Sequence, residues 1–274
     1  MYIVIGANSS IGYECVKHLA RLGSSRVIWE FGAETKARPQ RKLSRQTTPI
    51  LFKYGKSISE DMSLVAALAK KDGEELHRID GIVENAGTAE GSWVEKEENE
   101  TNTMVNVFST FLMALLMLPH LHNSARRFGI VPQLVIVGSG LAFQAKPIWE
   151  KMSIGSIFGD LRDRQEWEPK PSNTGYPLSK LLLTFAHFEF ADERHFLVLA
   201  CARLQIGIVL SLIGRSAEMG SGTLLHGLTV GEEAHERYLS VHSVPGWITD
   251  GDGREWQARV WEDIDAALEK TCPG

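Results

Sequence analysis

The sequence lacks the charge and hydropathy features of proteins that bind nucleic acids or span membranes. Its 29 Lys and Arg residues are outnumbered by 34 Asp and Glu, so the net charge is -5 and no basic excess favours a polyanion. The most apolar run, residues 107–118, has 12 residues and is too short to cross a bilayer, so we expect a buried helix there. No basic segment followed by an apolar stretch opens the chain, and we expect no signal peptide. These absences predict a cytoplasmic protein with neither a nucleic-acid nor a membrane partner.

Cysteine is scarce as well, with three among 274 residues. Cys15, Cys201 and Cys272 are widely spaced and include no CxxC pair, which argues against both a disulfide framework and a zinc site. The nine histidines show no metal-binding spacing such as HxxxH. We therefore predict no metal site and a reducing cellular setting.

No internal repeat, low-complexity tract or linker divides the sequence, which predicts a single domain over residues 1–274. Apolar runs typical of strands alternate with segments of helical periodicity. The predicted strands are 2–5, 26–31, 49–54, 79–85, 133–139 and 195–204, and the predicted helices are 11–23, 62–71, 101–122, 176–193 and 254–270. Such alternation forms right-handed crossovers and a parallel sheet that helices cover on both faces. The predicted fold class is therefore α/β, a doubly wound Rossmann fold with a central parallel sheet.

Three stretches show neither the apolar runs typical of strands nor the periodicity of helices. Residues 32–48 are basic, residues 140–175 contain a Pro/Ser/Asn/Gly cluster, and residues 212–235 are rich in glycine. Long irregular segments inside a compact domain are commonly functional loops. We predict that 140–175 and 212–235 cover the substrate.

The first predicted strand leads into the first predicted helix through "GANSSIG" at residues 6–12. Glycines in such a turn let the backbone approach a pyrophosphate, whose charge the helix N-terminus stabilises. A plain strand-to-helix turn would show a similar pattern. The position in the first strand–helix unit favours the dinucleotide interpretation.

Further motifs follow the glycine-rich turn in a definite order. They are "IGANSSIG" at 5–12, "NAG" at 85–87, Asn106 in "MVNVFSTF", Ser139 in "VGSGLAF", and Tyr176 with Lys180 in "YPLSK". Together they resemble the short-chain dehydrogenase/reductase family, single-domain Rossmann-fold enzymes that use a nicotinamide cofactor. The resemblance spans essentially the whole chain. Its C-terminal part is similar to the fungal, retinol-dehydrogenase-like branch, which is often found acting on natural products.

The residue types at the resembling positions suit carbonyl reduction. A free phenol has a pKa of about 10, and a lysine cation one helical turn away favours the phenolate, so Tyr176 and Lys180 suit proton transfer. The resemblance implies that Lys180 also binds the nicotinamide ribose, that Ser139 holds the substrate oxygen, and that Asn106 supports a water leading from Lys180 to solvent. Taken alone, the Tyr–Lys pair also fits an amphipathic helix start with a snorkelling lysine.

The same resemblance implies a bound dinucleotide. Five positions depart from the family pattern. Ile5 stands for a Thr, Ser10 for the middle Gly, and Gly55 for an Asp that often contacts adenine, while Ile206 stands for the Pro before Gly207 and Ser211 for the Thr that follows. The segment 85–87 also fits a plain turn after a strand. The predicted cofactor-binding residues are Gly6, Asn8, Ser9, Ser10, Ile11, Gly12, Glu30, Asn85, Ala86, Gly87, Tyr176, Lys180 and Gly207.

The end of the second predicted strand bears on the choice between NAD(H) and NADP(H). Glu30 there would bind the ribose hydroxyls of NAD and repel a 2′-phosphate, but the extra serine in "GSSR" can shift that position to Phe31 or Gly32. In that case basic residues within 36–42 could receive the phosphate. The preference stays open, with a slight lean to NADP(H) from the family.

The predicted activity is that of an NAD(P)-dependent ketoreductase, which moves a hydride between the nicotinamide and a carbonyl or secondary alcohol of a small, moderately apolar secondary metabolite. The departures on the cofactor side keep open a non-redox isomerase or cyclase that uses the Ser–Tyr–Lys set for acid/base chemistry. A non-catalytic binding protein is a third hypothesis. As in many relatives, a homodimer or homotetramer would form through helices 101–122 and 176–193, whose apolar faces need a partner unless the chain itself covers them.

Overall fold

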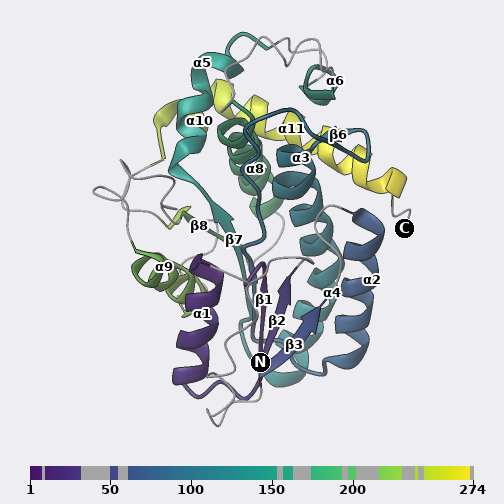
Figure 1. Cartoon of the computed structure of the whole chain (residues 1–274), viewed down its shortest axis with the longest axis vertical. Coiled ribbons are helices and arrows are strands. Elements are labelled where there is room, and N and C mark those ends of the chain that lie inside the picture. Colours follow the sequence, from purple (N-terminus) through teal and green to yellow (C-terminus); the bar gives the residue numbers. More distant parts are fainter. Residues whose placement is uncertain are drawn as a thin grey trace.

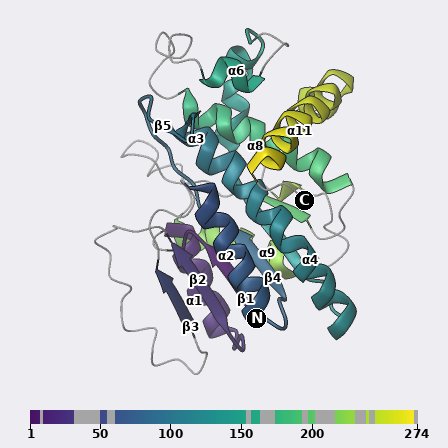
Figure 2. The same ribbon diagram turned by 90° about the vertical axis from the view of Figure 1, so that its right-hand side faces the viewer.

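Seven parallel strands form one sheet through the middle of the molecule (Figures 1 and 2). In their order across the sheet they are β3 (Ile50–Tyr54), β2 (Val27–Phe31), β1 (Tyr2–Ile5), β4 (Gly81–Glu84), β7 (Gln133–Gly138), β8 (Leu197–Cys201) and β9 (Tyr238–Leu239). The computed structural model describes residues 1–7, 10–31, 50–54, 61–152, 157–162, 174–192, 197–201, 216–229, 238–239 and 244–271. The predicted doubly wound α/β fold is confirmed.

Helices cover both faces of the sheet (Figure 1). On one face lie α1 (Ser10–Arg21) and α9 (Ala217–Thr229), and on the other lie α2 (Met62–Glu75), α4 (Thr110–Phe128) and α8 (Gly175–Asp192). Successive side chains of a strand point to opposite faces. Accordingly Ile3 and Ile5 pack in the core under α2, α4 and α8, whereas Val4 packs under α1 and α9. A strand that helices cover on both faces therefore needs apolar residues at consecutive positions, as β1 has them.

The predicted buried helix around residues 101–122 extends over Thr101–Phe128 and changes its winding along the way. It begins as α3 (Thr101–Thr103), continues as the π-helix η3 (Met104–Ser109) and ends as α4. The carboxylate of Glu100 caps its start by accepting a hydrogen bond from Thr103 N at 3.0 Å, and Gly129 ends it in the left-handed region at φ 60°. Its length and apolarity would suffice for a membrane span, but 78% of its most apolar window is buried inside the protein. It is a core helix of the fold.

The C-terminal helix α11 (Gly251–Thr271) lies across α8 and reaches α4 (Figures 1 and 2). The Trp261 ring stands 5.5 Å from the Phe111 ring of α4 and 5.1 Å from the Phe190 ring of α8, measured between centroids. Val260 and Ile264, on the same face of α11, are fully buried. The helix faces predicted from the sequence to need a second subunit are thus covered, where α11 lies, by the chain itself.

The prediction of irregular chain over 212–235 is wrong for Ala217–Thr229, which form α9. The glycines of this segment lower its helix propensity. Leu224 and Leu228, which are four residues apart, both bury their side chains in the core cluster that also contains residues of α1, and this burial stabilises the helix. Tertiary packing therefore overrides local propensity here. Residues 212–215 and 230–235 lie outside the described residues, as do residues 32–48.

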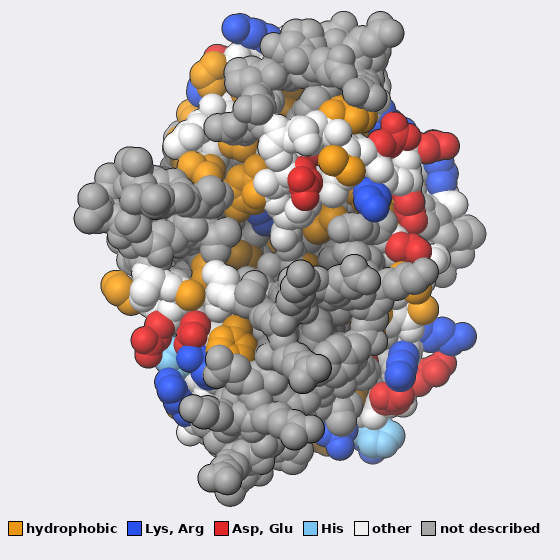
Figure 3. Space-filling model, viewed as in Figure 1, with side chains coloured by type: hydrophobic (Ala, Val, Ile, Leu, Met, Phe, Trp, Pro, Cys, Tyr) orange, Lys and Arg blue, Asp and Glu red, His pale blue; other side chains and the backbone are white. Residues whose placement is uncertain are grey.

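The stretch 140–175 also contains more regular structure than the sequence predicts. The elements that the sequence did not predict are η4 (Gly140–Ala145), α5 (Lys146–Trp149), α6 (Ile157–Arg162), α10 (Gly246–Thr249), the hairpin of β5 (Glu95–Lys96) and β6 (Asn99–Glu100), and the strand β9. Each of these elements is short, and short elements carry too few residues to show a period. On the described part of the face in Figure 3, acidic and basic side chains lie interspersed.

Candidate functional site

The predicted site residues come from segments far apart in the sequence that meet at the carboxyl edge of the sheet. β1 has β2 on one side and β4 on the other, so the order of the strands reverses between β1 and β4. Ligands of open α/β sheets bind in the crevice at such a switch point. The glycine-rich turn follows β1, residues 85–87 follow β4, and Ser139 follows β7.

The glycine-rich turn packs directly against the segment after β4. Gly6 has φ 71°, and a Cβ on it would stand 2.6 Å from both the Cα and the N atom of Ala86. A Cβ on Gly12 would stand 2.5 Å from Asn85 Nδ2. Asn85 Nδ2 donates a hydrogen bond to Gly6 O at 2.7 Å. Glycine is therefore required at both positions by close approach, and Asn85 joins the two halves of the turn.

Ser10 begins α1 in the left-handed region, at φ 54°. A residue with a Cβ is strained there by about 1–2 kcal/mol, which a glycine would not be. The side chain is exposed, at the N-terminal end of a helix whose dipole favours an anion. The next residue, Ile11, is buried in the core beneath the turn and anchors it.

Glu30 lies in the body of β2, level with Ile5 in the register of the two strands. Phe31 is the last residue of that strand, and Gly32 lies outside the described residues. The backbone thus places Glu30 beside the residue that precedes the glycine-rich turn. The assignment of the ribose-binding position stays a prediction.

The predicted acid/base residues come from β7 and α8. Ser139 follows β7 and is 5% exposed, and its hydroxyl accepts a hydrogen bond from Leu141 N at 3.3 Å. Tyr176 and Lys180 lie one turn apart at the start of α8. Lys180 is buried, and its Nζ donates to Val137 O at 2.7 Å. A Cβ on Gly87 would stand 3.8 Å from the same Nζ, so the lysine bridges β7 and the segment after β4.

Asn106 lies in the π-helix η3, and a hydrogen-bond network fixes its side chain. Its Oδ1 accepts from Thr88 N, and its Nδ2 donates to Thr88 O and to Ser179 Oγ, each at 2.9 Å. The Ser179 hydroxyl donates in turn to Tyr176 O at 2.9 Å. π-Helical turns are rare and often occur at functional sites. Here the turn directs an amide that ties the segment after β4 to the helix carrying Tyr176.

The structure therefore brings Lys180, Asn106 and Gly87 together, with Tyr176 one turn from Lys180. Ser139 follows the strand whose Val137 carbonyl holds Lys180. Asn8, Ser9 and Gly207 lie outside the described residues.

Sequence reasoning missed Thr88, Ser179 and Glu84. Ser179 stands inside "YPLSK", and its place between Tyr176 and Lys180 was a usable signal.

Glu84 is the last residue of β4 and is buried, at 4% exposure. Burial raises the pKa of its carboxyl to about 8, because the surroundings cannot solvate the charge. The side chain is therefore mostly neutral at pH 7. An acid ending the apolar run "GIVE" was the signal available in the sequence.

The residues at the switch point fit a dinucleotide. Gly6 and Gly12 carry no side chain at the two close approaches of the turn, and Gly87 is exposed in the segment after β4. The N-terminal end of α1 adds a partial positive charge. Among the described residues, no three His, Cys, Asp or Glu side chains lie close enough together to hold a metal ion.

Comparison with known proteins agrees with this geometry. A protein-family model described as short chain dehydrogenase matches residues 1–151, more than half of the 274-residue chain. The chain is 27% identical to the short chain dehydrogenase/reductase dmxR8 of Cryptosporiopsis sp. (strain 8999), an alignment that covers 99% of this chain and 91% of the relative. It is 28% identical to the short-chain dehydrogenase/reductase phmF of Phaeosphaeria nodorum, covering 98% of this chain and 86% of the relative.

Solved structures with the same fold include NADH-dependent reductase A1-R' complexed with NAD, with a TM-score of 0.63 and 18% identity over 88% of this chain and 93% of that one. Another is a 3-ketoacyl-ACP reductase from Sinorhizobium meliloti 1021, with a TM-score of 0.62 and 14% identity over 87% and 96% of the two chains. At these identities the likeness shows a shared fold.

Proposed function

Since the protein belongs to the short-chain dehydrogenase/reductase family and is an oxidoreductase of that family, we propose that it transfers a hydride between a nicotinamide cofactor and a carbonyl or secondary alcohol. The proposed substrate is a small, moderately apolar secondary metabolite, which the fungal relatives support. The observation that carries the proposal is the position of Lys180. Its Nζ lies between β7 and Gly87, one helical turn from Tyr176, at the switch point where the glycine-rich turn also lies.

In the direction of reduction, the Tyr176 hydroxyl gives its proton to the carbonyl oxygen of the substrate. The nicotinamide, when bound, supplies the hydride that reduces the carbon. The Ser139 hydroxyl donates a hydrogen bond to the same oxygen and stabilises the negative charge that develops there. Oxidation of an alcohol reverses these roles, with Tyr176 as the base.

Lys180 stabilises the tyrosinate through its positive charge and is placed to bind the nicotinamide ribose. Its buried ammonium is already held by Val137 O, so it loses little freedom when a ligand arrives. Asn106 holds the backbone at Thr88 against α8 and would support a water between Lys180 and solvent. The cofactor is NADP(H) or NAD(H).

A second candidate function is a non-redox isomerase or cyclase that uses the same Ser139, Tyr176 and Lys180 for acid/base chemistry. The observation favouring it is Ser10, which puts a side chain and a left-handed backbone in the turn that would meet the pyrophosphate. Separate fluorescence titrations with NADH and NADPH distinguish the two. Binding of either one supports the oxidoreductase, and binding of neither favours the non-redox enzyme.

The proton-transfer role is tested by Tyr176→Phe. We expect turnover, measured as NADPH or NADH oxidation with a ketone that the wild-type protein accepts, to fall by about 10²- to 10⁴-fold. Cofactor affinity should stay unchanged, because the ring and its packing remain. Tyr2→Phe, at the opposite end of β1, is the matched control and should keep full turnover. Full turnover by Tyr176→Phe would exclude Tyr176 as the proton donor.

The cytoplasmic location and the homodimer or homotetramer stay predictions. Because α11 packs along α8 and contacts α4 through Trp261 and Phe111, a subunit interface would have to use the parts of these helices that α11 does not cover. Sedimentation equilibrium at micromolar concentration measures the assembly directly.

A further inference from the structure

Glu84 is a buried carboxyl that the proposed proton transfer does not use. Its Oε1 atom has no hydrogen-bond partner among the residues that the structure describes. Buried polar atoms in folded proteins are nearly always hydrogen-bonded, because an unmade bond raises the free energy of the folded state. An apolar residue of similar size would pack at this position without that penalty. The carboxyl therefore requires an explanation beyond folding.

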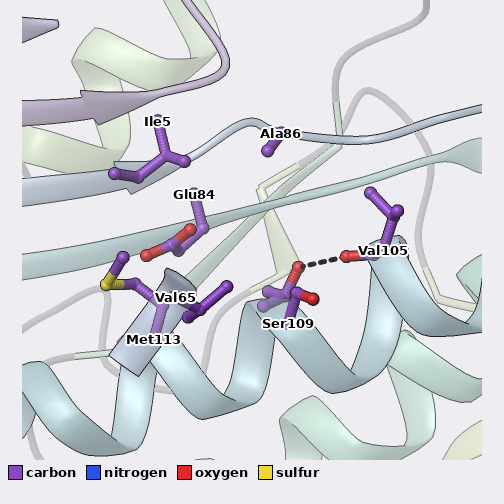
Figure 4. A pocket seen from close by; sticks show the side chains of 8 residues that line it. Ile5, Val65, Glu84, Ala86, Val105, Ser109 and Met113 are labelled. Carbon is purple, nitrogen blue, oxygen red and sulfur yellow. Dashed lines mark hydrogen bonds between the residues drawn. The ribbon is translucent and has the colours of Figure 1, made fainter. Parts of the chain in front are cut away.

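The carboxyl faces a small cavity between the sheet and the helices of one face (Figure 4). The walls are largely apolar, with Val65 from α2 and Met113 from α4 beside Glu84, and Ser109 from η3 further along. The hydroxyl of Thr110, which also lines the cavity, already donates to Val105 O at 3.3 Å. The cavity offers about 20 Å³ to the centre of a water-sized sphere, enough for one water or one polar group of a ligand.

This cavity adjoins the turn that would hold the pyrophosphate of a bound dinucleotide. Ile5, which precedes Gly6, and Ala86, which Gly6 closely approaches, both line it. Val65 belongs to the first turn of α2, the helix that follows β3. A dinucleotide with its pyrophosphate at the turn and its nicotinamide toward Tyr176 extends its adenosine to the side of β1, β2 and β3.

We propose, on the basis of the proposed function, that Glu84 recognises the purine of the cofactor by accepting a hydrogen bond from its exocyclic amino group in this cavity. One amino group matches both the free acceptor and the size of the space. Among the residues lining the cavity, Glu84 is the one titratable group.

The chemistry of the carboxyl suits this role in either ionisation state. Desolvation keeps the group mostly neutral before the ligand binds, and its carbonyl oxygen can then accept the amino hydrogen. If the group ionises, the bond becomes charge-assisted and stronger. In both states the ligand supplies the partner that the described part of the chain does not.

The test compares AMP with purine riboside 5′-monophosphate, which differs only by lacking the amino group. Both are titrated as competitors of NADH or NADPH fluorescence. We expect the wild-type protein to bind AMP roughly 10-fold or more tightly than the analogue, the range for a hydrogen bond to an ionisable group. Glu84→Met should bind both alike. Reduced nicotinamide mononucleotide, which has no purine, should bind the two proteins equally.

A matched control is Met113→Leu, which lines the same cavity and removes no polar atom, and should keep the preference for AMP. Glu84→Met should also unfold at a higher temperature than the wild type, because it removes an unpaired buried carboxyl. A gain in stability together with a loss of purine discrimination separates recognition from a purely structural role.

Three outcomes decide the matter. If the wild-type protein binds a dinucleotide but does not distinguish AMP from its analogue, this inference fails and the proposed function stands. The same holds if Glu84→Met keeps the preference, and the cavity then holds only water. If the wild-type protein binds no dinucleotide at all, the proposed function and this inference fail together.

Discussion

The two halves of the site differ in how completely their polar groups are paired. On the acid/base side, the amide of Asn106 makes three hydrogen bonds and the Lys180 ammonium is held by Val137 O. On the dinucleotide side, Ser10 carries a left-handed backbone, and Glu84 Oε1 has no partner among the described residues. The first half is arranged before any ligand binds, as catalysis requires. The second half holds strain and unmade bonds that a ligand can relieve.

The largest effect is expected from Gly6→Ala on the dinucleotide side. The new Cβ would stand 2.6 Å from the Ala86 backbone, in a left-handed conformation, and should lower the free energy of unfolding by about 3 kcal/mol. NADH binding should be lost with the turn. Urea unfolding and fluorescence titration measure the two effects.

Gly23→Ala is the matched control for Gly6→Ala. Gly23 has a similar φ, 77°, but nothing lies within 4 Å of its Cβ position. Gly23→Ala should lower the free energy of unfolding by only about 1 kcal/mol, the cost of a left-handed backbone for alanine, and should keep NADH binding. Equal losses in the two variants would show that close approach to Ala86 is unimportant.

Glu84→Gln should change how stability depends on pH. Burial raises the carboxyl's pKa from 4.5 to about 8, so its ionisation does not lower stability below pH 4.5, and stability falls as the pH rises from 4.5 through 8. Compared with Glu84→Gln, the wild-type protein should lose roughly 2–3 kcal/mol of stability between pH 5 and pH 7. Urea unfolding at pH 5, 7 and 9 measures the difference. Parallel pH curves for wild type and Glu84→Gln would contradict the raised pKa.

Ser179→Ala tests the pairing on the acid/base side. It removes the acceptor of Asn106 Nδ2 and the donor to Tyr176 O, and should cost about 1 kcal/mol of stability. Turnover should fall about 10-fold, because the helix carrying Tyr176 is held less firmly against Asn106. Ser124→Ala, which removes a buried acceptor of Ile79 N far from the site, should cost similar stability and leave turnover intact. Equal turnover in both variants would refute the positioning role.

The smallest effect is expected from Ser10→Gly. Glycine relieves the backbone strain at φ 54° but gives the unfolded chain more conformational freedom. The free energy of unfolding should therefore rise by about 0.5 kcal/mol. Dinucleotide affinity should rise, because the backbone can approach the pyrophosphate more closely. Thermal unfolding and NADH titration check both. A loss of affinity would mean that the Ser10 side chain itself binds the cofactor.

Local sequence patterns predicted the core of the fold well. The strands β1, β4 and β7 and the helices α1 and α8 lie within a few residues of their predicted bounds, since each combines a clear period with a terminal signal. The glycine-rich turn and the Tyr176–Lys180 pair were equally visible. The helix α9 was missed, because its glycines conceal a period that only packing against α1 reveals.

What the sequence by itself determined is the α/β architecture and the residue types of the acid/base set, because strands, helices and a four-residue spacing are local properties of the chain. Only the tertiary structure decided that Asn106 is joined to Tyr176 through Ser179, that Asn85 closes the glycine-rich turn, that α11 packs on α8 and reaches α4, and that Glu84 faces a cavity. Each of these depends on contacts between residues far apart in sequence. Such contacts form only when the sheet has brought its strand ends together, and no local period records them.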